Sequence, residues 1–383
     1  MSATAELKST GLEGVTAGKT AICSVNQTQL IYRGFEIADL AEHATFEEVA
    51  FLLLEGHKPS KDELARFDQE LKSQRAIPEQ VTTYLQAAVP ALKSGAAVPM
   101  DVLRTAVSIL GNLDPQSQAI DADAELAKAK RLTAQIATVI GHMQNLLDGK
   151  AIVTPDPNLS HAANLLYMIT GDKPSDEYAR VIDVSLILYA EHDYNASTFT
   201  SRVIAGTLSD MHGAVTGAIA ALKGPLHGGA NEAAMDMMKE IFDAHAKGTS
   251  VEDWMQQAFD QKKKLMGFGH RVYKNGDHRA SILMELGRKI AQDIGGDAVT
   301  LFELGDRVIE IMREQKNIHP NVDFPCGLTY YVMGIPVPQY TPIFVASRIT
   351  GWAAHIMEQH SNNRLIRPIA EYAGPKLRQW NDA

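Results

Sequence analysis

The sequence predicts a mainly α-helical fold with very little β-structure. Several segments begin with a capping hydroxyl residue three positions before an acidic residue, which is a start signal for a helix. Other segments repeat apolar residues every three or four positions, as a helix with one buried face does. Only residues 20–35, TAICSVNQTQLIYRGF, alternate in the manner of a strand, so any sheet is small.

The start signals follow one another along the chain. Thr45, Ser60 and Ser250 each stand three residues before an acid, and Asn231 can cap an apolar helix over 232–242.

The last helix signal covers residues 341–360, where Thr341 can be the cap and Pro342 the first helical residue. Apolar residues then recur at helical spacing: Val345, Ile349, Trp352 and Ile356. Arg348 is therefore expected to lie on a largely buried helix.

Breaks rich in Gly and Pro separate the helices at residues 149–160, 223–231, 266–279 and 321–327. The last three contain His227, His270 and Asp323. Loops between long helices can bring distant side chains together, so these three residues are candidates for a site. The alternatives are that each histidine is an ordinary core residue and that Asp323 caps a helix beginning near Phe324.

Composition excludes several classes of partner. The chain has 383 residues, enough for two domains, and a formal net charge of −10, which opposes general binding to nucleic acid or an anionic membrane. An anionic ligand must therefore meet a local basic cluster. The first twenty residues lack signal-peptide or transit character, and the two cysteines, Cys23 and Cys326, form no metal or disulfide pattern, so we expect a cytoplasmic protein.

The residues around His270 and Asp323 favour a role in binding or catalysis. Gly267 and Gly269 keep the backbone open beside His270, and basic residues follow it: Arg271, Lys274 and Arg279. That composition is typical of an anion site. Asp323 is an isolated acid among Pro, Val, Phe and Cys, and an apolar setting raises the pKa of a carboxyl group and strengthens it as a base.

Competing chemistries find little support. A zinc site could use His192, His227, Glu232, His270 and Asp323, but no His-Glu-x-x-His motif and no cysteine pair is present. The sequence also lacks the Gly-x-Ser-x-Gly elbow of a serine hydrolase and a strand before the Gly-x-Gly of 267–269.

The chain resembles the citrate synthase family from residue 11 to residue 375. The segments that carry this resemblance are LIYRGF (30–35), EHDYNAST…GPLHGGANE (191–232), KKKLMGFGHRVYKNGDHRA (262–280), NVDFPCG (321–327) and SRITGWAAHIMEQHSNNRLIRP (347–368). The resemblance implies a helical homodimer in which a mobile, CoA-binding small domain, residues 222–330, closes over a large domain, residues 1–221 and 331–383. The motif GFGHRVYK resembles the corresponding motif of the short bacterial branch of the family, which also contains 2-methylcitrate synthases.

The resemblance also implies roles. His227 would stabilise the enol or enolate of acetyl-CoA, Asp323 would take its methyl proton, and His270 would polarise the ketone of oxaloacetate. The expected ligands of the oxaloacetate carboxylates and keto group are His192, Arg279, Arg348 and, from the partner subunit, Arg367. A condensation of this Claisen type needs such a base, such a donor and such arginine clamps.

CoA is expected as a substrate thioester, with no metal and no other cofactor. The CoA contacts that we expect are Lys262, Lys263, Lys264, Gly267, Phe268, Gly269 and Lys274. The run of three lysines can instead be a solvated helix end.

The resulting expectation is a citrate synthase of the tricarboxylic acid cycle, which forms citrate and CoA from acetyl-CoA, oxaloacetate and water. A 2-methylcitrate synthase that uses propionyl-CoA, or a dual enzyme, is the nearest alternative. A non-catalytic helical scaffold and a metal-dependent lyase are more distant ones. Pro325-Cys326 replace a frequent Tyr-Ser after the aspartate, and an accessible Cys326 would make activity sensitive to alkylation.

Overall fold

A computed structural model describes residues 11–12, 14–270, 272–274, 276–377 and 379. Its strands form one small antiparallel sheet in the order β1 (Cys23–Val25), β2 (Leu30–Tyr32) and β3 (Phe35–Glu36). Cys23 pairs with Tyr32, and a turn with Arg33 and Gly34 at positive φ joins β2 to β3. The sequence prediction of a short strand region within a helical fold is therefore confirmed.

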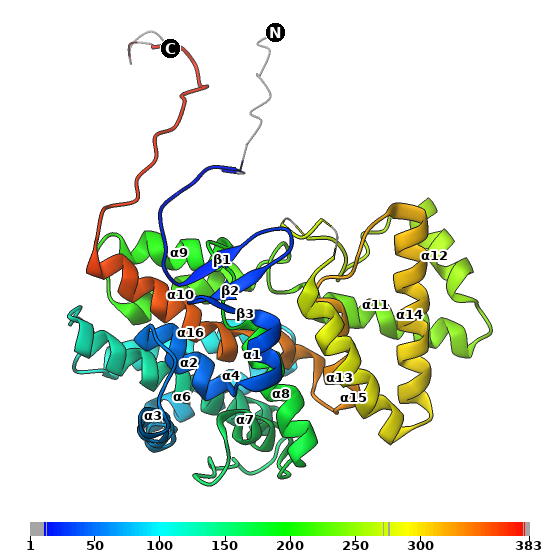
Figure 1. The fold of residues 1–383 in the computed structure, drawn as a ribbon, viewed down its shortest axis with the longest axis horizontal. Coiled ribbons are helices and arrows are strands. Elements are labelled where there is room, and N and C mark those ends of the chain that lie inside the picture. Colours follow the sequence, from blue (N-terminus) through cyan, green and yellow to red (C-terminus); the bar gives the residue numbers. More distant parts are fainter. Residues whose placement is uncertain (1–10, 13, 271, 275, 378, 380–383) are drawn as a thin grey trace.

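The sheet lies at the upper edge of a large group of helices in Figure 1. This group comprises α1 (Ile37–His43), α2 (Phe46–Glu55), α3 (Lys61–Ser73), α4 (Glu79–Lys93), α5 (Pro99–Leu113), α6 (Ala122–Leu147), α7 (His161–Thr170), α8 (Asp176–Tyr189), α9 (Ala196–Ala205), α10 (Met211–Leu222) and α16 (Tyr340–Ser361). Helix α16 is buried along most of its length because α2, α6, α8, α9 and α10 all pack against it. Arg348 lies on this helix, as predicted.

The remaining helices lie together to one side of the large group, on the right in Figure 1. They are α11 (Ala230–Ala246), α12 (Val251–Asp260), α13 (His278–Ile294), α14 (Asp297–Lys316) and α15 (Asp323–Val332), and the 3-10 helix η1 (Val337–Gln339) leads from them to α16. Helix α13 packs against α8 and α1 of the large group. The domain boundaries at 221/222 and 330/331, and the mobility of residues 222–330, stay predictions.

Most of the predicted helix starts are confirmed. Thr45 and Ser60 form complete capping boxes with Glu48 and Glu63. The hydroxyl of Ser250 accepts a hydrogen bond from the backbone N–H three residues later, which is the predicted cap of α12.

Two predicted caps are wrong. Helix α16 begins at Tyr340, one residue before Thr341, whose hydroxyl donates to the carboxylate of Glu232 instead. Helix α11 begins at Ala230 with Gly229 at its cap position, so Asn231 lies inside the helix. In both cases the helix begins one residue before the predicted cap residue, which therefore has helical neighbours on both sides.

Among the described residues, no helix combines the length and the apolar character needed to cross a bilayer. Cys23 and Cys326 are both buried free thiols.

Candidate active site

A cavity of about 1020 Å³ is lined by residues from both groups of helices. Six of the seven residues predicted for catalysis or oxaloacetate binding lie in its wall: His192, His227, His270, Arg279, Asp323 and Arg348. They come from the segment after α8, the turn between α10 and α11, the loop before α13, and the helices α13, α15 and α16. The fold thus brings together side chains that are more than 150 positions apart in the sequence.

The loop that carries His270 is fastened to the segment that carries Asp323. The backbone N–H of Asn321 donates to the carbonyl of Gly267 at 2.9 Å, and its side chain donates to the carbonyl of Gly269 at 3.0 Å. Gly267 has φ +82°, and a Cβ there would lie 2.9 Å from Cβ of Phe324. Only glycine fits this close approach without displacing α15.

His270 is held as a neutral donor. Its Nδ1 accepts hydrogen bonds from the backbone N–H groups of Val272 (3.1 Å) and Tyr273 (3.2 Å), so the neutral ring carries its proton on Nε2. Burial, and then the charge of Arg279, lowers the pKa of His270 to about 4. At neutral pH its Nε2–H can therefore donate to a carbonyl oxygen.

His227 is also a neutral donor, with the opposite tautomer. The backbone N–H of Ser197 donates to its Nε2 at 3.3 Å, and the Ser197 hydroxyl lies 2.8 Å from the same nitrogen. The proton is then on Nδ1. Burial, and then the charge of Arg348, lowers the pKa of His227 to about 4. A Cβ at Gly228 would lie 2.7 Å from the carbonyl oxygen of Leu222, which explains one glycine of the pair after this histidine.

Asp323 is the first residue of α15, and its side chain caps no helix. The alternative of a capping residue is therefore wrong, because the helix begins at Asp323 itself. The hydroxyl of Tyr189 donates to Oδ1 of Asp323 at 2.8 Å. Burial raises the pKa of this carboxyl to about 6, against the hydrogen bond from Tyr189, which lowers it. Such a group is a carboxylate at neutral pH and a stronger base than an exposed one.

Arg348 offers an unsatisfied donor to the cavity. Its Nε donates to the backbone carbonyl of Tyr189 at 2.6 Å, and its guanidinium lies 4.7 Å from the ring centroid of Phe344. The side chain is only 1% exposed, yet its Nη1 has no hydrogen-bond partner within the described residues. A buried donor without a partner is costly, and an anionic ligand in the cavity would satisfy it.

The guanidinium group of Arg279, in contrast, is largely hydrogen-bonded within the protein. Its Nε and Nη2 donate to the two carboxylate oxygens of Asp277 at 3.0 and 2.8 Å. Nη1 donates to the carbonyl of Leu188 at 3.3 Å, so only part of the guanidinium remains for a ligand. His192, whose pKa is lowered well below its usual value by burial, lies with Nε2 3.1 Å from the hydroxyl of Tyr273.

The other predicted residues divide into two sets. Lys264, Gly267, Phe268 and Gly269 line the cavity, whereas Lys262, Lys263, Lys274 and Arg367 do not. Lys263 pairs with Glu240 and lies 5.0 Å from the ring centroid of Trp254, and Arg367 is exposed in the C-terminal segment. Arg271 lies outside the described residues. The CoA contacts and the role of Arg367 across a dimer stay predictions.

Cys326 is not an accessible thiol. Cys326 lies on α15 with its side chain fully buried, and burial raises the pKa of the thiol to about 12. The condition for the predicted sensitivity to alkylation, an accessible thiol, is therefore not met in this structure, since the reactive form of cysteine is an exposed thiolate.

The described residues contain no cluster of three or more His, Cys, Asp or Glu side chains arranged to hold a metal ion. The zinc site considered from the sequence is thus not assembled, although four of its five candidate residues line the cavity.

Sequence reasoning missed Ser197, Tyr189 and Asp277, which support His227, Asp323 and Arg279. Asp277 stands two residues before Arg279 and could have been found from that spacing. Tyr189 and Ser197 carry no local signal, because their partners lie far away in the chain.

Comparison with known proteins identifies relatives over almost the whole length. The family described as "Citrate synthase, C-terminal domain" matches residues 11–369. A 2-methylcitrate synthase of Shewanella oneidensis is 44% identical over 99% of this chain and 98% of its own, and a citrate synthase of Deinococcus radiodurans is 42% identical over 97% of both. The structure of the ternary complex of citrate synthase from Thermoplasma acidophilum with carboxymethyl coenzyme A and oxaloacetate has a TM-score of 0.89, 31% identity and 97% coverage of both chains.

Proposed function

The chain belongs to the citrate synthase family, and we propose on that premise that it condenses acetyl-CoA with oxaloacetate and hydrolyses the product to citrate and CoA. Members of this family are enzymes, which removes the alternative of a non-catalytic scaffold. The observation that carries the proposal is the meeting of one carboxylate, Asp323, and two neutral histidine donors, His227 and His270, on one cavity.

The first half of the reaction uses Asp323 and His227. The carboxylate removes a proton from the methyl carbon of acetyl-CoA, and its raised pKa brings it closer to that of the carbon acid. Negative charge then develops on the thioester oxygen, where the Nδ1–H of His227 donates a hydrogen bond.

The second half uses His270 and the arginines. The Nε2–H of His270 polarises the ketone of oxaloacetate, and the enolate carbon attacks the ketone carbon. The ketone oxygen takes up one proton to become the hydroxyl of the condensed product, which balances the proton that Asp323 removed. Arg348, with its free Nη1, and the remaining donors of Arg279 hold the carboxylates. Water then attacks the thioester of the condensed product, which releases citrate and the CoA thiol.

The acyl donor of the proposed reaction is either acetyl-CoA or propionyl-CoA. Relatives at similar identity are named citrate synthase and 2-methylcitrate synthase, so propionyl-CoA is the second candidate donor. The chemistry at Asp323 and His227 is the same for both donors, because each has an acidic carbon next to the thioester.

Turnover with acetyl-CoA and with propionyl-CoA, measured at saturating oxaloacetate by loss of thioester absorbance, tests the proposal. We expect consumption that depends on oxaloacetate, with a higher kcat/KM for acetyl-CoA. A higher kcat/KM for propionyl-CoA would make the protein a 2-methylcitrate synthase. No oxaloacetate-dependent consumption of either thioester would contradict the proposed function, and loss of activity on chelation would favour a metal-dependent lyase.

We further propose that the protein is a cytoplasmic homodimer with active sites shared between subunits and no cofactor besides the CoA substrate. The complex of the Thermoplasma acidophilum relative with a CoA derivative and oxaloacetate supports the choice of ligands.

A further inference from the structure

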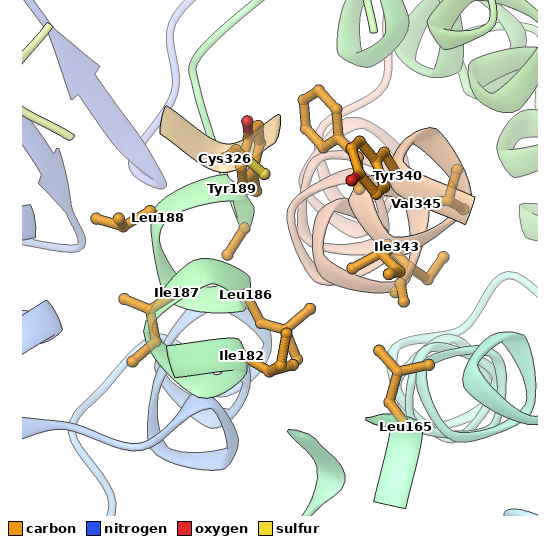
Figure 2. Close-up of a cluster of buried hydrophobic side chains, with 14 of the residues drawn as sticks. Leu165, Ile182, Leu186, Ile187, Leu188, Tyr189, Cys326, Tyr340, Ile343 and Val345 are labelled. Carbon is orange, nitrogen blue, oxygen red and sulfur yellow. The ribbon is translucent and has the colours of Figure 1, made fainter. Parts of the chain in front are cut away.

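A row of hydroxyl and thiol groups lies between α8 and α15, directly behind the candidate base. Ser185 and Tyr189 stand four residues apart on α8, and Asp323, Cys326 and Tyr330 are spaced by three and four on α15. These spacings place each set on one helix face. Figure 2 shows Cys326 beside Tyr189 among apolar side chains.

The groups of this row bond to one another. The hydroxyl of Tyr189 donates to Oδ1 of Asp323 at 2.8 Å and also contacts the thiol of Cys326. The hydroxyls of Ser185 and Tyr330, which belong to the same row, lie 2.6 Å apart. In an apolar interior a hydroxyl group needs a partner, so the bond to Asp323 fixes the orientation of the Tyr189 hydroxyl.

The two oxygens of the Asp323 carboxylate are consequently unequal. Oδ1 is occupied by Tyr189, whereas Oδ2 has no hydrogen-bond partner among the described residues. Tyr189 also accepts the Nε–H of Arg348 on its backbone carbonyl, so one residue contacts both the base and an arginine of the cavity wall.

We propose that Tyr189 is a positioning residue for the reaction: its hydroxyl, which packs beside Cys326, holds Oδ1 of Asp323 and leaves Oδ2 to take the substrate proton. This inference rests on the proposed function, in which Asp323 is the base. A hydrogen bond to one oxygen limits rotation of the carboxylate and stabilises its charged form.

The charged surroundings of Asp323 define the expected pH effect. Burial raises its pKa most, and Asp277 beside α13 raises it as well, whereas the hydrogen bond from Tyr189 and the charges of Arg279 on α13 and Arg348 on α16 lower it. The pKa of Tyr189 is itself raised well above its usual value by burial and by the Asp323 charge, so its hydroxyl keeps its proton. Removing the hydroxyl should therefore raise the pKa of Asp323.

The test replaces Tyr189→Phe, which removes one oxygen and keeps the ring. We expect kcat to fall by about tenfold or more, since a hydrogen bond to a charged group is lost. KM for oxaloacetate should change by less than about threefold, since the carboxylate ligands remain. The acid limb of kcat/KM for the acyl donor should move to higher pH by about one unit.

Tyr340→Phe is the matched control. Tyr340 lies in the same buried cluster, and its hydroxyl has no partner in the described structure (Figure 2). This variant should keep the pH profile of the wild type. A purely structural effect would lower the thermal unfolding midpoint in either variant without moving the acid limb.

An unchanged kcat and acid limb in folded Tyr189→Phe, together with an inactive Asp323→Asn, would overturn the positioning role while the proposed function stands. If Tyr189→Phe does not fold, Cys326→Ala decides in the same assay: an upward shift of the acid limb supports the proposal, and an unmoved limb refutes it. A wild type that consumes neither thioester would instead remove the proposed function.

Discussion

Protonation of the candidate catalytic side chains is set by their immediate neighbours. Backbone N–H groups can only donate, so the bonds from Ser197 and from Val272 and Tyr273 place the proton of His227 on Nδ1 and that of His270 on Nε2. Burial keeps both rings neutral, with pKa values of about 4, and raises the pKa of Asp323 to about 6. Two donors and one base therefore coexist at neutral pH.

Asp323→Asn keeps the size of the side chain and removes the base. We expect turnover to fall by roughly 10²–10⁴, the usual contribution of a positioned general base, while the thermal unfolding midpoint stays close to that of the wild type. Steady-state kinetics with saturating oxaloacetate measure the loss. Near-normal turnover in the folded variant would mean that another group removes the proton.

His227→Ala removes the donor to the developing enolate oxygen. Turnover should fall on the order of 10²–10³, the range found when one oxyanion donor is deleted. Binding of oxaloacetate alone, followed by calorimetry, should be nearly unchanged. An effect limited to oxaloacetate affinity would show that His227 serves the other substrate.

Local signals predicted the elements better than they predicted the contacts. The capping boxes at Thr45 and Ser60 depend on residues three positions apart, and the structure confirms them. Thr341 and Asn231 had the right residue types, but each lies inside its helix because the helix begins two residues earlier than its cap motif predicts.

The candidate site was predicted to a similar extent. Six catalytic and oxaloacetate-binding residues of the cavity were recognised from motifs, whereas Tyr189, Ser197 and the burial of Cys326 could not be, because they depend on how α8, α9 and α15 meet. The exposure of a thiol in particular is decided by tertiary packing and not by its neighbours in sequence.

The tie between the His270 loop and α15 gives a prediction at the scale of elements. Gly267→Ala combines a positive φ with a Cβ that would lie 2.9 Å from Cβ of Phe324 and 3.0 Å from that of Ala234. We expect a loss of about 2–4 kcal/mol in the free energy of unfolding, from backbone strain and overpacking together. Thermal and denaturant unfolding measure it.

Gly248→Ala is the control for backbone strain alone, since Gly248 has φ +89° and no atom within 4 Å of an added Cβ. It should lose only about 1–2 kcal/mol. Equal losses in the two variants would show that contact with α15 does not constrain the loop.

Buried histidines make the stability of the whole molecule depend on pH. His161 is 1% exposed and neither ring nitrogen has a partner within the described residues, and burial followed by the charge of Arg75 lowers its pKa to about 3. The unfolded pKa is about 6.5, so below that pH the unfolded state binds more protons than the folded state. The stabilisation is complete above about pH 6.5 and is lost as the pH falls towards 3.

His161→Phe isolates this effect, since the ring packs 5.1 Å from that of Phe46 and Phe preserves an aromatic ring there. Between pH 7.5 and 5.5 the wild type should lose about 1.4 kcal/mol more unfolding free energy than the variant. Denaturant unfolding at one protein concentration provides the comparison. The same pH dependence in both proteins would show that His161 is not protonated on unfolding.

The C-terminal segment after α16 bears on the proposed assembly. It runs away from the body of the chain in extended form (Figure 1), and it exposes large apolar side chains: Leu365, Ile369, Tyr372 and Leu377. Arg367 lies within it, exposed and outside the cavity of its own chain. An apolar segment that finds no cover on its own chain is suited to a second copy, and this supports the proposed homodimer.

Mixed dimers test whether Arg367 completes the site of the partner. Loss of an arginine from a buried carboxylate costs about 2–5 kcal/mol, so the Arg367→Ala variant should be nearly inactive at ordinary substrate levels. The Asp323→Ala variant should be nearly inactive as well. If Arg367 acts across the interface, a dimer with one subunit of each kind has one intact site and one site with both lesions. Co-expression with two affinity tags should then restore up to about half of the wild-type activity per mixed dimer. If Arg367 serves its own chain, every site keeps one lesion, so tag-purified mixed dimers without activity would refute the shared site.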